Sequence, residues 1–267
     1  MSPRPLARLV VAAAAVGSFA YVTLAAQRPA SPAEIATGPG IAGPDITGSW
    51  DRYRPAPAAA GAPRDPYAPP PPSPAPLKAP YLGEWQATIQ AVRDADAKGE
   101  PLAAGVIHCI PEGMPAMMNG PFPLEILQSR GQVTIIEEAY TQVRRILLDK
   151  PQKAVDEVEP GFYGHSVGRW EGDTLVADTI GVKESVRYQN RPHSKDMRIR
   201  ERFRLVAPDI LWDEITIEDP VTLETPWTYT VAYKRMTNYT LLEYICEDNR
   251  EYADDKGVQR IRIGGNR

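Results

Sequence analysis

The sequence predicts a mainly β protein: an antiparallel up-and-down β-barrel of about eight strands, preceded by one amphipathic helix. After Gly131 the chain is a succession of short runs rich in β-branched and aromatic residues, which is typical of strands. Short turns separate most of these runs, as in antiparallel sandwiches and barrels. No stretch has the pattern of a βαβ crossover, so a parallel sheet is disfavoured. Eight consecutive strands can close into a barrel without exposed edges, which favours the barrel over a sandwich.

The N-terminus has the features of an export signal in residues 1–26. Arg4 and Arg8 precede an apolar run from Leu9 to Ala26, and this arrangement predicts a signal that is cleaved near Ala26. An uncleaved membrane anchor is the alternative, because the run approaches the length that spans a bilayer. Both interpretations place the body of the protein outside the cytoplasm, and only the second adds a membrane tether.

A proline-rich segment, residues 27–80, separates this signal from the predicted barrel domain at residues 81–258. It contains more than half of the 28 prolines, so it lacks amide donors and is expected to be a largely disordered spacer. Residues 46–51 interrupt it as a short ordered piece, in which Trp50 is expected to dock on the body. The triplet Gly48-Ser49-Trp50 resembles the first-strand signature of lipocalins, and the resemblance implies a lipocalin-like barrel.

Charge and cysteine content narrow the range of partners. The chain carries a formal net charge of −4, and removal of the two signal arginines leaves about −6. This negative charge argues against a nucleic-acid partner, whose phosphates require a basic face. Cys109 and Cys246 fit a disulfide, which is common in exported proteins, whereas a reactive thiol lacks any redox or nucleophile motif here. His108 beside Cys109 has no second ligand pair at metal-binding spacing. No metal or cofactor is therefore predicted.

A helix is predicted from Tyr81 to Lys98. Trp85, Ile89 and Val92 recur at helical spacing among charged residues, which indicates an amphipathic helix that packs through this stripe. Gly99 is expected to end the helix.

The segment 108–118 is expected to be a methionine-rich loop. Met114 and Met117 could line the mouth of a cavity, because methionine adapts to apolar ligands. The alternative is a loop that only packs against the body and is fixed there by the disulfide.

The predicted barrel strands follow this loop. They are Gln132 to Ala139, Gln142 to Asp149, Ser166 to Glu171, Thr174 to Val182, Asp196 to Val206, Ile210 to Glu218, Trp227 to Arg235 and Thr240 to Glu247. A hairpin that turns at Glu171-Gly172-Asp173 lies at the centre of this series.

Glu201 gives the sharpest chemical signal in these strands. The residues that alternate with it on one strand face are apolar, namely Met197, Ile199, Phe203 and Leu205, and arginines occupy the other face. If the apolar face lines the barrel, desolvation would favour the protonated form of Glu201, which suits a general acid or base. The alternative is an internal ion pair with Arg145 or Arg169.

Three further residues complete a candidate catalytic set. His165 and His193 lie near strand ends, so neighbouring hairpins could bring them to one mouth of the barrel, where histidine can exchange protons near neutral pH. Asp178 alternates with Val176 and Ile180 and is expected to face the same cavity as Glu201. Ordinary hydrogen bonding is the alternative role for each histidine.

A set of motifs resembles a family of exported bacterial proteins without an established activity. The longest motif is Gly164-His165-Ser166-Val167-Gly168-Arg169-Trp170-Glu171-Gly172-Asp173-Thr174-Leu175-Val176. The others are Cys109-Ile110-Pro111-Glu112-Gly113-Met114-Pro115, Pro192-His193-Ser194, Glu201-Arg202-Phe203 and Glu243-Tyr244-Ile245-Cys246. The resemblance covers roughly Trp50 to Asn249 and implies a periplasmic or secreted protein, but no reaction.

Two functions are consistent with these observations, besides a scaffold without any site. The first is a barrel that binds a small apolar or aromatic molecule in a cavity of about a few hundred Å³. The residues expected to line this cavity are Trp170, Met114, Met117, Trp227 and Tyr229. The second is a metal-free acid–base enzyme, such as a lyase, isomerase or hydrolase, with Glu201 as the base and a histidine as the proton donor. It requires at least two of its four catalytic candidates within about 6 Å of each other.

Overall fold

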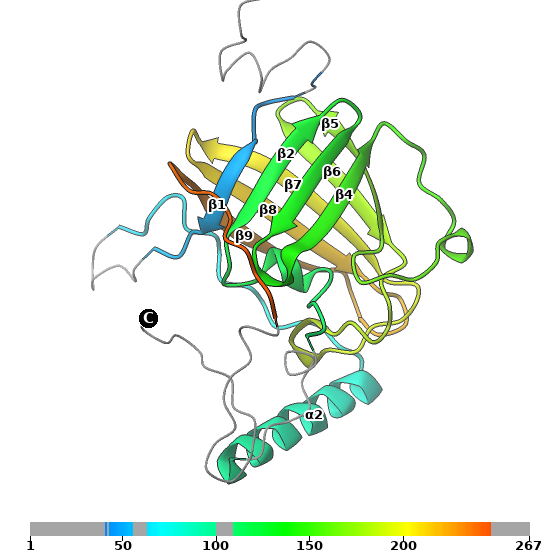
Figure 1. Ribbon diagram of the computed structural model, residues 1–267. Helices are drawn as coiled ribbons and strands as arrows, with labels where there is room; N and C mark the ends of the chain where they lie inside the picture. Colours follow the sequence, from blue (N-terminus) through cyan, green and yellow to red (C-terminus); the bar gives the residue numbers. More distant parts are fainter. Residues whose placement is uncertain (1–40, 42, 56–62, 100–108, 247–267) are drawn as a thin grey trace, which may run out of the picture.

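The computed structural model describes residues 41, 43–55, 63–99 and 109–246 of the chain. In these residues nine strands form one closed barrel, accompanied by the helix α2 (Ala79–Lys98) (Figure 1). The strands are β1 (Gly48–Arg52), β2 (Leu124–Ser129), β3 (Gln132–Glu137), β4 (Gln142–Leu148), β5 (His165–Glu171), β6 (Thr174–Ile180), β7 (Arg198–Ala207), β8 (Ile210–Glu218) and β9 (Trp227–Met236). The predicted signal, residues 1–26, lies outside the described residues. None of the described helices has the length and apolarity to cross a membrane.

Each strand pairs with its neighbours in chain order, and β1 closes the ring by pairing with β9. The neighbours are antiparallel except for β4 and β5, which are parallel. A ring with an odd number of strands cannot alternate in direction all the way round, so it needs a parallel pair. Residues 149–164 supply the long crossover that such a pair requires, and Figure 1 shows them returning along the outside of the barrel. The antiparallel prediction is therefore correct for the other pairs.

Seven of the predicted strands are confirmed as β3 to β9. The strand expected from Thr240 to Glu247 is wrong, because its described residues, 240–246, form no strand and cross the outside of the barrel instead. Glu138 Oε2 holds this segment by accepting hydrogen bonds from the Tyr239 hydroxyl at 2.6 Å and from Leu242 N at 2.8 Å. Once β1 and β9 pair, the barrel has no free edge for a further strand.

Two strands, β1 and β2, were missed by the prediction. β1 is only five residues long and lies within the proline-rich range 27–80, where composition alone predicts disorder. β2 follows Pro121-Phe122-Pro123 and reads Leu-Glu-Ile-Leu-Gln-Ser, so its alternation is interrupted at Leu127. Both strands are fixed by their partners in the ring, a long-range effect that local sequence does not contain.

The described parts of the range 27–80 belong to the barrel body. Trp50 is fully buried, as expected, and its indole nitrogen donates to Ile46 O at 3.0 Å. Residues 63–78, which we call the strap, lie against the barrel: Leu77 pairs with Leu223 in an isolated bridge, and the Trp212 indole donates to Tyr67 O at 3.0 Å. The ordered body therefore begins before residue 81. The rest of the expected spacer, residues 27–40, 42 and 56–62, lies outside the described residues.

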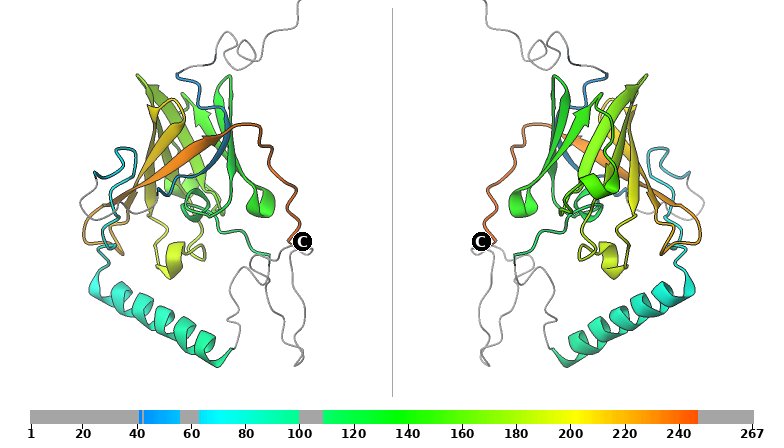
Figure 2. Two further views of the ribbon diagram at one scale, coloured as in Figure 1. Left: turned by 90° about the vertical axis from the view of Figure 1, so that its left-hand side faces the viewer. Right: turned by 90° about the vertical axis from the view of Figure 1, so that its right-hand side faces the viewer.

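The predicted helix is present as α2, but Trp85 is the only residue of the expected stripe among those that pack against the core. Figure 2 shows it projecting from one end of the barrel, which we call the mouth. Two side chains attach it there: the Trp85 indole donates to Gln189 O at 3.0 Å, and Glu84 pairs with Arg187 at 2.7 Å. Gly99 follows the helix with a φ of 67°, the left-handed conformation that ends helices.

The barrel interior is filled by large side chains. The largest fully buried ones include Trp50, Phe203 and Tyr233 from the strands, together with Met114, Met117 and Met118. These methionines enter at the mouth, on and beside a short 3₁₀ helix, Ala116–Met118. Met114 and Met117 are therefore core residues in this structure, and the alternative of a packed, disulfide-fixed loop describes them correctly.

The predicted disulfide is present. Cys109 and Cys246 are bonded, which ties the methionine-rich loop to the C-terminal segment that crosses the outside of the barrel. Such bonds form and persist in oxidising compartments. The bond therefore indicates that the protein matures in an oxidising environment.

Candidate functional site

The mouth of the barrel is closed by the loop 109–121, which we call the plug. Inner-face side chains of β1 and β9 hold it: the Tyr233 hydroxyl donates to Met118 O, and Arg52 Nη1 donates to Asn119 O at 2.8 Å. Asn119 Nδ2 in turn donates to the Tyr229 hydroxyl at 3.2 Å. With its methionines in the core and its backbone held by the strands, the plug excludes a ligand from this end of the interior.

A groove of about 1210 Å³ lies outside the plug, at the mouth. One wall is the proline run 69–72 of the strap, and a second is the outer rim of the plug. The third wall is residues 185–191, which we call the mouth loop, and Trp227 and Tyr229 at the start of β9 form the floor. The Trp227 indole donates to Ser73 O at 2.9 Å, so the strap is bonded to this floor. Segments far apart in the sequence thus meet at one surface.

Three aromatic rings form the floor of the groove. Tyr188 of the mouth loop stacks on both β9 aromatics, with ring centroids 6.0 Å from Trp227 and 5.8 Å from Tyr229. The two β9 rings lie 4.8 Å apart and are each only 6 % exposed, whereas Tyr188 is half-buried. Burial raises the pKa of Tyr188 and of Tyr229, so both hydroxyls are neutral donors at physiological pH. The floor is thus an uncharged aromatic surface, in which the Trp227 and Tyr229 rings are tilted by 44° to each other.

The walls of the groove are positively charged. Four arginines line it, Arg52, Arg54, Arg187 and Arg191, against a single acid, Glu112. The Arg191 guanidinium lies between two indoles, 5.0 Å from the centroid of Trp85 and 5.0 Å from that of Trp227, the arrangement of a cation–π contact.

These arginines differ in whether a carboxylate neutralises their charge. Arg187 pairs with Glu84, but no carboxylate of the described residues lies within ion-pair distance of Arg52 or Arg191. Burial lowers the pKa of Arg191, and Arg52 Nε is a buried donor without an acceptor in the described part of the chain. The groove therefore contains positive charge that is partly dehydrated and not neutralised by the protein.

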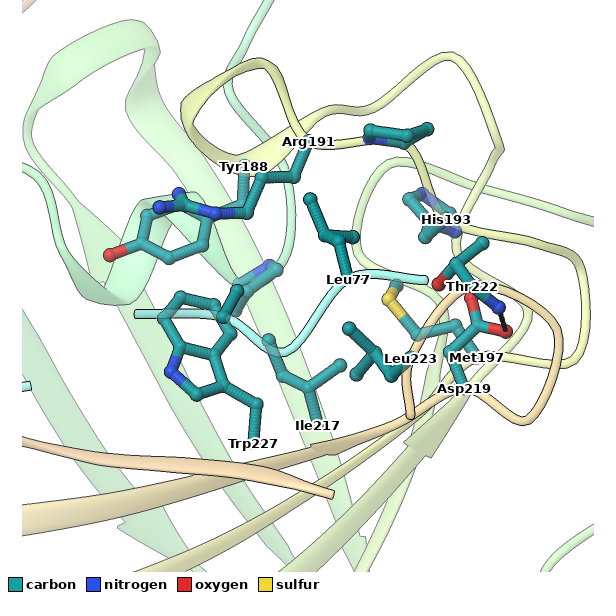
Figure 3. Close-up of a pocket in the computed structure, with 13 residues that line it drawn as sticks. Leu77, Tyr188, Arg191, His193, Met197, Ile217, Asp219, Thr222, Leu223 and Trp227 are labelled. Carbon is teal, nitrogen blue, oxygen red and sulfur yellow. Dashed lines mark hydrogen bonds between the residues drawn. The ribbon is translucent and has the colours of Figure 1, made fainter. Parts of the chain in front are cut away.

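A small apolar pocket lies beside the groove (Figure 3). Tyr188, Arg191 and Trp227 line both spaces, so they form the partition between them. The pocket is otherwise lined mainly by apolar side chains, among them Leu77 and Ile217, and its volume is about 30 Å³. That volume holds about one or two water molecules, so the larger groove is the only one of the two that fits an organic ligand.

A polar cluster lies inside the barrel, separate from the groove. Arg144 forms a bidentate ion pair with Glu201, with Nη1 2.8 Å from Oε1 and Nη2 bonded to Oε2, and both side chains are fully buried. Arg144 also donates to Ser166 Oγ at 3.2 Å and to Thr179 Oγ1 at 3.0 Å. The expected internal ion pair of Glu201 is thus confirmed, and each of its carboxylate oxygens accepts from Arg144.

The partner of Glu201 was predicted incorrectly as Arg145 or Arg169. On β4 the inward side chains alternate, so Arg144 is buried and Arg145 is exposed. Arg169 points outward from β5, where it pairs with Glu171 at 2.5 Å. The error is one of strand phase, because the two consecutive arginines of β4 cannot be assigned to faces until the register is known.

Asp213 is a buried acid that the sequence analysis missed. Its side chain is fully buried on the inner face of β8, and neither carboxyl oxygen has a hydrogen-bond partner in the described residues. Desolvation raises its pKa well above the ordinary value, and the neighbouring Glu201 adds to the shift. The signal was the same as for Glu201, because Asp213 alternates with Leu211 and Ile215.

Glu137 is a third buried carboxyl, at the mouth end of β3. Desolvation raises its pKa to about 9, with a further contribution from Glu112, although the hydrogen bond from Gln142 Nε2 acts in the opposite direction. Its carboxyl packs on Gly120 of the plug, where any Cβ would clash with Oε1. Glu137 is therefore a neutral, packed group at neutral pH and does not reach the groove.

The structure does not bring the four catalytic candidates together. Asp178 lies on the outer face of β6, where it pairs with Arg200 at 2.7 Å, and Glu201 lies on the inner face of the adjacent strand. His165 also lies outside, with Nδ1 2.9 Å from Gln152 Oε1. Desolvation lowers its pKa, which keeps the ring neutral near pH 7.

His193 is near the mouth, as expected, but its ring is engaged. Nδ1 lies 2.9 Å from Ser194 O and Nε2 lies 2.8 Å from Val186 O. Both ring nitrogens therefore face backbone carbonyl oxygens, and neither is left for a substrate. The side chain lines the small pocket of Figure 3 rather than the groove.

The ligand-lining candidates are divided between three places. Trp227 and Tyr229 form the floor of the groove. Met114 and Met117 are in the core, and Trp170 lies near the far end of the barrel, with its ring against Gly43. Tyr188 and Arg191 were missed because a mouth loop carries no periodic pattern, and only the three-dimensional fold places it on β9.

No group of three or more His, Cys, Asp or Glu in the described residues could hold a metal ion. Comparison of the sequence with protein-family models and with curated proteins gives no match.

Proposed function

We propose that this protein is a periplasmic or secreted barrel that binds a small aromatic molecule in the groove at its mouth. The observation that supports it most is the stack of Tyr188, Trp227 and Tyr229 at the floor of a groove of about 1210 Å³. Planar rings of this kind offer an aromatic ligand offset stacking at the usual distances. The space is larger than most ligand pockets, so the ligand occupies only part of it.

The location differs from a lipocalin-like interior cavity. The plug fills the mouth end of the barrel with Met114, Met117 and Met118, and the polar cluster around Arg144 uses its own hydrogen bonds. A ligand in the interior would have to displace these groups, whereas a ligand in the groove would only cover Tyr188. The mouth is therefore the more favourable place.

Tyr188→Leu tests this function because it removes a ring while keeping an apolar side chain. We expect the affinity for 2-naphthol, measured by isothermal titration calorimetry, to fall about 5- to 10-fold, as stacking contributes about 1 kcal/mol. Trp170→Leu is the control, since it removes a half-buried ring near the far end of the barrel. The affinity of this variant for 2-naphthol should match that of the wild type. Absence of 2-naphthol binding to the wild type, or an equal loss in both variants, would contradict the proposal.

A further inference from the structure

Building on the binding function proposed above, we infer that the ligand is an aromatic monocarboxylate, with its ring against Tyr188 and its carboxylate on Arg191. Both side chains belong to the mouth loop and line the same groove. They lie in one short turn in which Gln189 and Asn190 adopt positive φ values of 52° and 62°. This turn places a ring and a cation close together in the groove.

Arg191 is prepared to receive an anion. Its guanidinium is held between the Trp85 and Trp227 rings, each 5.0 Å away, so little side-chain entropy remains to be lost on binding. Gln189 Oε1 accepts from Nη1, and in the described residues no acceptor binds its remaining side-chain N–H groups. A planar guanidinium with free donors matches the two oxygens of a carboxylate.

The environment makes a counter-ion favourable at this position. The indole faces remove water from Arg191 but supply no formal negative charge, so the cation is dehydrated without being neutralised. A bound carboxylate would replace the lost hydration with charge-assisted hydrogen bonds. Arg144 in the barrel interior has such a partner already, in Glu201.

The charge of the groove is opposite to that of the chain. The whole sequence is acidic, with a formal net charge of −4, yet four arginines and one glutamate line the groove. A local positive field of this kind concentrates anions at the site. It disfavours a cationic aromatic ligand.

A ligand with one negative charge fits the groove better than a ligand with two. Arg187 is already paired with Glu84, and Arg54 is exposed to solvent. Arg52 holds the plug through Nη1, and its Nε is buried. Arg191 is thus the one guanidinium of the groove that is both stacked on aromatic rings and free of a carboxylate in the described residues. A monocarboxylate can be neutralised by Arg191 alone, whereas a phosphate dianion would bring one uncompensated charge into an aromatic environment.

Three matched probes separate this inference from the binding function itself: 2-naphthoate, its neutral amide 2-naphthamide, and 2-naphthyl phosphate. We expect the wild-type protein to bind 2-naphthoate about 10- to 100-fold more tightly than 2-naphthamide, the usual range for hydrogen bonds to a charged group. Isothermal titration calorimetry of the whole protein measures each affinity. The preference should decrease as salt is raised, because ions screen the partly exposed pair.

Arg191→Gln should abolish the preference, so that 2-naphthoate and 2-naphthamide bind with similar affinities. Arg200→Gln is the control: it removes an arginine charge on the outer face of the barrel, where Arg200 pairs with Asp178, and it should keep the wild-type ratio. Arg191→Lys retains the charge without the planar stack and should keep a reduced preference. If Arg191→Gln does not fold, Arg191→Lys tests the role of Arg191 in its place.

The outcomes are distinguishable. If none of the three probes binds, the proposed binding function itself fails. The wild type could bind 2-naphthamide as tightly as 2-naphthoate, or bind 2-naphthyl phosphate more tightly than 2-naphthoate. Either result would support the binding of aromatic molecules but contradict the inference that the ligand is a monocarboxylate. If Arg191→Gln keeps the wild-type ratio, the assignment to Arg191 is overturned.

Discussion

Arg144 is fully buried and Arg191 is half-buried, and their neighbours differ as well. Arg144 lies inside the barrel, where Glu201 binds it through two oxygens and two hydroxyls bind it as well. Arg191 lies at the mouth between two indoles, and no carboxylate of the described residues pairs with it. The interior arginine is fully dehydrated and neutralised by a carboxylate, whereas the arginine at the mouth is partly dehydrated and is not neutralised by the described residues.

The difference separates a structural role from a binding role. An ion pair that is fully buried and bonded to groups inside the barrel is out of reach of a ligand, and its main effect is on folding. A partly dehydrated cation without a carboxylate partner can still bind an anionic ligand. The comparison therefore assigns stability to the interior cluster and recognition to the groove, and three variants test that assignment.

Glu201→Leu should have the largest effect. It leaves the fully buried Arg144 without its carboxylate, and breaking such a pair lowers the free energy of unfolding by about 3–5 kcal/mol. The double variant Arg144→Met/Glu201→Leu should recover most of this loss, because both charges are then absent. Urea unfolding followed by circular dichroism measures both changes, with the exposed Glu218→Gln as the control. A loss below about 1 kcal/mol in the single variant would contradict a structural role for the pair.

Asp213→Asn should have a smaller effect of opposite sign. The folded-state pKa of Asp213 is raised, so its contribution to stability is fully present below the unfolded pKa of about 3.9 and is lost as the pH rises above it. The variant should thus match the wild type near pH 4 and have a higher free energy of unfolding than the wild type at pH 7. Denaturant unfolding at several pH values measures this divergence. The exposed Asp209→Asn should show no such divergence from the wild type. If the free energy of unfolding of the wild type rises relative to that of Asp213→Asn as the pH increases, the expected sign is wrong.

Arg191→Gln should have the smallest effect on folding. The lost cation–π contacts, each about 0.5–1 kcal/mol, are offset by the removal of a dehydrated charge. We therefore expect the free energy of unfolding, measured in urea, to change by less than about 1 kcal/mol. A loss as large as that of Glu201→Leu would mean that Arg191 is structural, and the contrast between the two arginines would disappear.

The sequence was most informative where a strand is long and one of its faces is buried. The alternation around Glu201 predicted both the inward face of β7 and an internal ion pair, and both are present. It could not supply the partner, because choosing between Arg144 and Arg145 requires the register of β4. It also failed for β1, whose five residues become a strand only through pairing with β2 and β9.

The groove was the least predictable part of the molecule. Trp227 and Tyr229 were singled out by their alternation on β9, but Tyr188 and Arg191 lie in a loop without periodicity. Proline content suggested a spacer, whereas the strap forms a wall of the groove because the Trp227 indole bonds to Ser73 O. Loops meet at such a surface through the folded barrel, and local sequence does not record which loops become neighbours.

The disulfide has a further consequence for the topology of the barrel. It joins positions 137 residues apart and encloses β2 to β9 in one covalent circle, while β1 precedes that circle. The disulfide therefore does not hold β1, which stays in the ring through its pairing with β2 and β9 and through the buried Trp50.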